Sequence, residues 1–258
     1  MEKTATTHSL HSDVEKLVDS GIPLSKAKEY VQIVDSIAIQ AGRLAFNAHR
    51  GQRLIEASEK VRGADARAAD DILRAIVVLM HASLEDFLRS VSAVHLRYAS
   101  PDILNDVPLL HVEKERPEKF FLGALVEYRD MSVSDLIDRS VEKYLERTTY
   151  NSTRDIAGVL RAVGIPSDRY APLFPELDKM ISRRHYIVHR ADLAKNASED
   201  TNLNVISPKE VRMWVDTVQQ FGRDVTNEVS AHRIIELINQ DAPRFSSDIA
   251  LSDQQASE

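Results

Sequence analysis

The densest group of ionisable side chains in the sequence lies between Arg183 and Asp192. It holds three arginines and two histidines, which are Arg183, Arg184, His185, His189 and Arg190. Imidazole has an unperturbed pKa of about 6.5, so it can accept or donate a proton near neutral pH. The guanidinium of arginine matches phosphate oxygens in a bidentate way. These residue types therefore suit proton transfer beside a bound phosphate.

The sequence around this group predicts a helix. Pro175 suits a first helical turn, and Glu176 and Asp178 place negative charge at the positive end of the helix dipole. Apolar residues recur at helical spacing, namely Leu177, Met180, Ile181, Ile187, Val188 and Ala191. At about 100° per residue they form one stripe, and Arg184 falls close to its centre.

An arginine in an apolar stripe needs acceptors for its hydrogen bonds, because a guanidinium does not give up its proton. One interpretation is a buried structural ion pair between Arg184 and an Asp or Glu elsewhere in the chain. Alternatively, a phosphate, a carbonyl group or water accepts these bonds. The sequence leaves these interpretations open.

His185 and His189 lie one helical turn apart and share a face, which would permit a metal site. The residues between them lack the Glu of a zinc protease, and the sequence contains no Cys. We therefore expect no metal here. Histidines that are solvated, or that lie at the edge of the core, are the structural alternative.

Four residues separate Arg184 from His189, and the polar His185 follows the arginine directly. This pattern resembles the signature of the HEPN superfamily (higher eukaryotes and prokaryotes nucleotide-binding domains). Members of this superfamily are all-helical and often act as metal-independent ribonucleases. The stretches Ala82 to Arg89 and Thr149 to Ile165 are similar to those of a group of stand-alone bacterial HEPN proteins. The resemblance extends over roughly residues 70–230, and only the Arg/His motif is diagnostic.

The resemblance implies an all-α helical bundle that cuts RNA without a cofactor. The 2′-hydroxyl of the RNA would attack the adjacent phosphate and leave a 2′,3′-cyclic phosphate. This implies proton transfer by His189 and binding of the scissile phosphate by Arg184. The implied supporting or RNA-binding residues are His185, Arg183, Arg190 and Glu85.

Glu85 and its neighbour Asp86 are candidates because a helix in this part of HEPN domains often carries an acidic group near the active arginine. Both fall off the apolar stripe of their own helix. A solvated face, with His81 and Glu85 paired one turn apart, is therefore the alternative interpretation.

Residues five apart on a regular helix point about 140° away from each other, so Arg184 and His189 of one chain do not converge. HEPN domains commonly dimerise with two copies of the motif in a shared cleft. We therefore expect a homodimer that binds an RNA substrate. The resemblance also allows an antitoxin or a regulatory partner protein.

The composition is that of an ordinary globular protein, with 258 residues, 43% hydrophobic and 28% charged. The low numbers of Gly (8) and Pro (9) favour long helices, and the lack of Cys excludes thiol catalysis. A net charge of -7 argues against general coating of nucleic acid, although the Arg/His run allows a confined positive cleft. With no secretory signal and no membrane-spanning apolar run, we expect a cytoplasmic protein.

We expect one all-helical HEPN-like domain over residues 12–240, between a disordered N-terminus at 1–11 and a flexible tail at 241–258. Within it, N-terminal helices cover residues 12–60, broken at Gly21 to Pro23, and a HEPN core covers about 66–240. The predicted core helices span 66–98, 118–130, 134–146, 152–163, the motif helix, and a last helix from Pro208 to about residue 239.

The resemblance implies a metal-independent endoribonuclease of HEPN type, with a toxin or anti-phage defence role by family precedent. One alternative is a HEPN module that binds RNA, a nucleotide or a partner protein without cutting. A second alternative is a structural helical dimer in which Arg184 only fixes packing.

Overall fold

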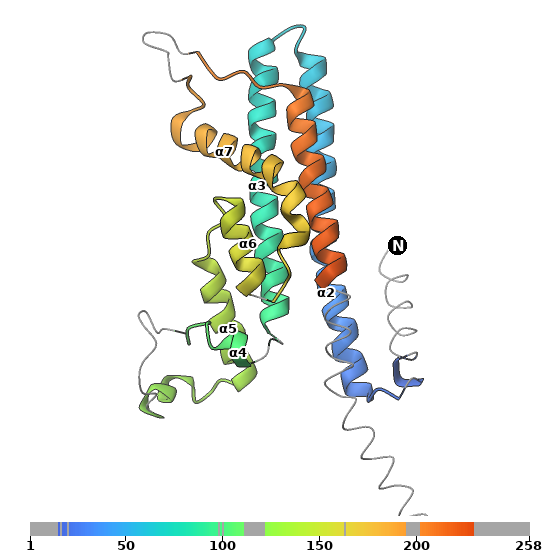
Figure 1. The fold of residues 1–258 in the computed structure, drawn as a ribbon, viewed down its shortest axis with the longest axis vertical. Helices are drawn as coiled ribbons and strands as arrows, with labels where there is room; N and C mark the ends of the chain where they lie inside the picture. Colours follow the sequence, from blue (N-terminus) through green and yellow to red (C-terminus); the bar gives the residue numbers. More distant parts are fainter. Residues whose placement is uncertain are drawn as a thin grey trace, which may run out of the picture. The chain divides into compact units, whose positions relative to one another are not determined.

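The computed structural model describes residues 15, 17–19, 21–97, 99, 101–110, 122–162, 164–194 and 202–229 (Figure 1). The predicted disordered N-terminus and flexible tail lie outside these ranges, as do the predicted helical residues 118–121 and 230–239. The described residues are helical apart from turns, loops and one isolated β-bridge between Leu193 and Leu203. The predicted all-α fold is therefore confirmed.

The chain divides into two compact units, one of residues 1–39 with 226–258 and the other of residues 40–225. In the first unit, α2 (Leu24–Val61) begins after a turn at Gly21. The φ of Gly21 is +89°, in the left-handed region that glycine adopts without steric cost. The predicted break at residues 21–23 is therefore confirmed, and the helix that follows buries Ala27, Tyr30, Ile33 and Ile37.

Three helices run side by side in the second unit (Figure 1). The first is the part of α2 from residue 40 to residue 61, and the second is the whole of α3 (Ala66–Leu96). The third is the helix of residues 208–229, of which residues 208–225 belong to this unit. A Cβ atom at Gly51 of α2 would lie 3.3 Å from Met80 Sδ and 3.4 Å from Val215 Cγ2. A Cβ atom at Gly222 would lie 2.2 Å from a methyl group of Leu44, so any other residue there would require the Leu44 side chain to shift.

Capping side chains define where the helices begin. Asp65 accepts a hydrogen bond from Ala68 N at 2.9 Å at the start of α3, and the predicted range of 66–98 agrees closely. Ser132 and Ser152 act in the same way at α5 (Val133–Glu146) and α6 (Thr153–Ala162). The remaining short elements are α4 (Pro101–Leu104) and the 3-10 helices η1 (Leu122–Tyr128) and η2 (Asp168–Leu173).

The predicted motif helix is α7 (Phe174–Arg190), which has Pro175 in its first turn. It packs against α3, α6 and η2, and its buried residues are Leu177, Met180 and Ile181. The helix ends at Ala191 and Asp192, whose φ values of 47° and 57° are both left-handed. None of the helices in the described part of the chain combines the length and apolar character needed to span a bilayer.

Candidate functional site

The helix α7 distributes the side chains of the Arg/His run over different surfaces. Arg184 extends the buried stripe of Leu177 and Ile181 and is itself half-buried, as its position in the pattern predicts. His185 and His189 are exposed. Val188 was expected in the stripe but is 48% exposed, so the buried stripe ends before the last turn of α7.

A pocket of about 270 Å³ opens around Arg184, and we call it the arginine pocket. Its lining residues are Asn151, Ile181, Ser182, Arg184, His185, Tyr186 and Arg190. The ring centroids of His185 and His189 are 4.7 Å apart, so His189 lies beside a lining residue. The structure therefore brings together Arg184, His185 and Arg190, with His189 adjacent.

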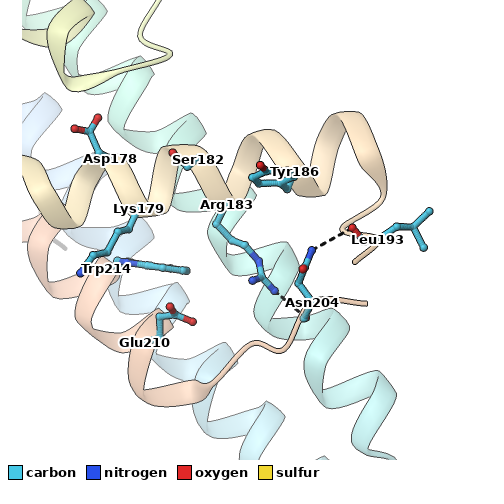
Figure 2. A pocket seen from close by; sticks show the side chains of 9 residues that line it. All are labelled: Asp178, Lys179, Ser182, Arg183, Tyr186, Leu193, Asn204, Glu210 and Trp214. Atoms are coloured by element: carbon cyan, nitrogen blue, oxygen red, sulfur yellow. Dashed lines mark hydrogen bonds between the residues drawn. The ribbon is translucent and has the colours of Figure 1, made fainter. Parts of the chain in front are cut away.

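Within the described ranges, the guanidinium of Arg184 makes no hydrogen bond and no ion pair. The buried ion pair that the sequence allowed for Arg184 is instead formed by its neighbour. Arg183 Nη2 donates to Asp192 Oδ2 at 2.8 Å and to the carbonyl oxygen of Asn204 at 2.9 Å, and Figure 2 shows the second contact. Asp192 is fully buried and also accepts from Arg74 Nε at 2.7 Å.

The role of Arg183 in RNA binding stays a prediction, and in the described residues its side chain donates to Asp192 and to the Asn204 carbonyl oxygen. Its side chain leaves α7 about 100° from that of Arg184, because the two residues are consecutive on the helix. It therefore reaches the segment after α7, where Asp192 balances its charge, and it does not line the arginine pocket. Arg184 is half-buried, and within the residues that the structure describes its charge has no partner of this kind.

Two side chains of α3, His81 and Glu85, lie close to each other, and the charge of Arg184 acts on His81. His81 Nδ1 is 3.8 Å from Glu85 Oε2, which confirms the predicted pairing. The expectation of a solvated face was wrong for His81, which is only 1% exposed, whereas Glu85 is half-buried and Asp86 is exposed. Burial lowers the pKa of His81, the charge of Glu85 opposes this change, and the charge of Arg184 lowers it further.

The sequence did contain a signal for the burial of His81. This residue shares the spacing of Val77, Leu84 and Leu88, which are all buried on α3. A histidine within such a stripe is a candidate to support the arginine from the protein interior. Its spacing from Glu85, one turn later, is also typical of a charged pair on a solvated face.

The segment before α6 closes the other side of the arginine pocket. Tyr150 is buried, and burial raises its pKa to about 12, so its phenol stays protonated. Asp178 of α7 accepts from the backbone N of Thr153 at 3.0 Å and from its Oγ1 at 2.7 Å. This contact ties the start of α6 to α7 and holds Asn151 beside Arg184.

A sequence model of the RiboL-PSP-HEPN family matches residues 47–231, which is more than half of the chain. This chain is a HEPN protein. The match includes α3, the arginine pocket and the helix of residues 208–229. HEPN domains are often ribonucleases, and they often bind RNA and dimerise. No curated protein and no solved structure matches the HEPN chain.

Proposed function

We propose that this HEPN protein is a metal-independent endoribonuclease. The observation that carries the proposal is the half-buried guanidinium of Arg184, which has no hydrogen bond or ion pair within the described residues and lies in a pocket beside the exposed His185 and adjacent to His189. Burying a cation without a partner is costly, so an anionic ligand would stabilise the site. A phosphate group of RNA has the charge and the oxygen geometry that a guanidinium binds best.

In this proposal the 2′-hydroxyl oxygen of the RNA attacks the adjacent phosphorus. The bond to the 5′-oxygen of the next nucleotide then breaks, which leaves a 2′,3′-cyclic phosphate. Arg184 stabilises the charge that develops on the phosphate oxygens. His189 transfers a proton, either from the attacking hydroxyl or to the leaving oxygen. His185 and Arg190 support binding from the pocket wall, and Glu85 pairs with His81 on α3.

A homodimer would complete the site. Because α7 remains helical to Arg190, Arg184 and His189 of one chain point about 140° apart. The face that carries His185, Val188 and His189 is exposed, so it is available to a second copy. In such a dimer, the His189 of one copy would face the Arg184 of the other.

The direct test is incubation of the purified protein with total RNA in EDTA, followed by analysis of the product ends. We expect cleavage with cyclic phosphate ends, which His189→Ala and Arg184→Ala strongly reduce. His49→Ala is a matched control because His49 is an exposed histidine on α2. Equal cleavage by wild type and both site variants would identify a contaminating nuclease and refute the proposal.

We further propose, by family precedent, that the protein acts as a toxin or a defence effector. Expression should then slow growth of the host, and Arg184→Ala should relieve this effect. RNA binding without cleavage under all conditions would instead support the non-catalytic HEPN module.

A further inference from the structure

A second and larger pocket, of about 590 Å³, lies between α7 and the helix of residues 208–229 (Figure 2). We call it the tryptophan pocket, because Trp214 contributes the largest side chain to its wall. Ser182 and Tyr186 line both this pocket and the arginine pocket. The two pockets are therefore neighbours along α7, so one bound oligonucleotide can occupy both.

Several polar groups in the wall of the tryptophan pocket already have partners. Asp178 accepts from Thr153, Arg183 donates to Asp192, and the side-chain amide of Asn204 donates to the Asp192 carbonyl oxygen at 2.9 Å. These groups build the wall. They are not available to select a ligand.

Other groups in the wall have no such partner. In the part of the chain that the structure describes, the Glu210 carboxylate and the Ser182 hydroxyl make no hydrogen bond. Trp214 is only 3% exposed, and its indole N–H donates to no acceptor there. Glu210 lies one turn before Trp214, so the two side chains share a face and extend toward α7 (Figure 2).

This combination of groups fits a nucleobase. Proteins that bind single-stranded RNA hold unstacked bases against aromatic side chains and hydrogen-bond their edges. Tyr186 supplies aromatic surface, Glu210 supplies an acceptor, and the volume lies in the range of ordinary ligand sites, whereas the largely buried Trp214 forms part of the wall. Lys179 also lines this pocket, but its Nζ already pairs with Glu176 Oε1 at 2.6 Å, so it is not one of the groups without a partner.

We propose that the tryptophan pocket is a nucleobase subsite that selects a base with an exocyclic amino group. This inference rests on the proposed function, because it places the base next to the phosphate bound by Arg184. The Glu210 carboxylate accepts from the amino group of cytosine, adenine or guanine. Uracil has no amino group and offers the carboxylate only its N3–H, which lies between two carbonyl oxygens, so pairing would bring a carbonyl oxygen against the carboxylate.

Trp214 is the only tryptophan in the chain, so its fluorescence reports occupancy of this pocket. The probes are four 2′-O-methyl tetranucleotides, of C, A, G or U, which cannot be cut because the 2′-hydroxyl is blocked. We expect the C, A or G probe to change the fluorescence at a concentration about tenfold lower than the U probe. No change with any probe, or an equal response to U, would overturn the inference.

The variant Glu210→Gln tests the role of the carboxylate directly. An amide both donates and accepts, so the preference over the U probe should fall to about twofold or less. Glu142→Gln is the matched control, because Glu142 is an exposed glutamate on α5 and should leave the preference unchanged. An unchanged preference in Glu210→Gln would overturn the assignment of Glu210.

The cleavage assay in EDTA separates the two proposals. RNA cleavage with no base preference in the fluorescence titration would refute only the nucleobase subsite. Base-selective binding that depends on Glu210, without cleavage, would refute only the endoribonuclease.

Discussion

Arg183 Nη2 donates a hydrogen bond to Asp192 Oδ2 at 2.8 Å, across the end of the helix that carries the candidate site. The same oxygen accepts from Arg74 Nε of α3 at 2.7 Å. Asp192 is fully buried and has a left-handed backbone, with φ of 57°. These two arginines therefore hold the end of α7 in place, close to His189 and Arg190.

Replacing Asp192 should destabilise the fold strongly. Asp192→Ala leaves two largely buried guanidinium groups facing each other without their shared acceptor. Breaking a buried pair in this way typically costs about 3 to 5 kcal/mol in the free energy of unfolding. Urea unfolding followed by far-UV circular dichroism measures this change.

Asp71→Ala is the control for this measurement. Asp71 also pairs with Arg74, at 3.1 Å, but its side chain is 60% exposed. An exposed pair contributes at most about 1 kcal/mol. Similar losses for both variants would contradict the anchoring role of Asp192.

The adjacent arginines should differ in what they do. Arg183→Ala removes one partner of the buried Asp192 and should lower the free energy of unfolding. Arg184→Ala removes a side chain that has no ion pair in the described residues, so the fold should remain stable. The same variant should reduce RNA cleavage by about 100- to 1000-fold, the usual effect of losing one group that stabilises transition-state charge. A large loss of stability in Arg184→Ala would instead support the purely structural dimer.

The helices could be predicted from the sequence because their signals are local. Apolar periodicity and caps gave α3, α5 and α6 to within about two residues of their observed ends. The helix starting at Pro208 also had a local signal, since Ser207 accepts from Glu210 N at 3.2 Å. A capping residue lies within four residues of the group that it satisfies, so no knowledge of the tertiary structure is needed.

The roles of Arg183 and Arg184 could not be predicted in this way. Both residues are arginines on the same helix, and the ion pair that distinguishes them joins Arg183 to Asp192. The left-handed turn after α7 and the contact of Asp192 with Arg74 of α3 place this carboxylate, and neither can be inferred from the helix alone.

His81 is different, because its spacing with Val77, Leu84 and Leu88 does predict that it faces the core. A helical wheel of α3 does not show, however, that the charge of Arg184 on α7 acts on it.

The buried His81 should make stability depend on pH. Burial lowers its pKa below the ordinary value of 6.5, so the unfolded chain binds a proton at a higher pH than the folded chain does. The free energy of unfolding should therefore fall as the pH decreases below about 6.5, by up to about 1.4 kcal/mol per pH unit from this residue. Urea unfolding between pH 7.5 and 5 should show a shallower dependence in His81→Gln.

The exposed His49 provides the comparison for this experiment. His49→Gln should reproduce the pH dependence of the wild type, because the change leaves the buried imidazole in place. Parallel curves for wild type and His81→Gln would contradict the prediction and would assign the pH dependence to other groups.

The proposed dimer predicts that two inactive variants restore each other's activity. In a mixture of Arg184→Ala and His189→Ala chains, each mixed dimer contains one site with an intact Arg184 from one chain and an intact His189 from the other. Since half of the dimers are mixed after full exchange and each has one of two sites intact, about a quarter of wild-type cleavage should return. The mixture is refolded together from urea and assayed in EDTA, with each variant refolded alone as the control. If both groups acted within one chain, no mixed dimer would contain a complete site, so the absence of recovery in dimers shown to have exchanged would rule out the shared site.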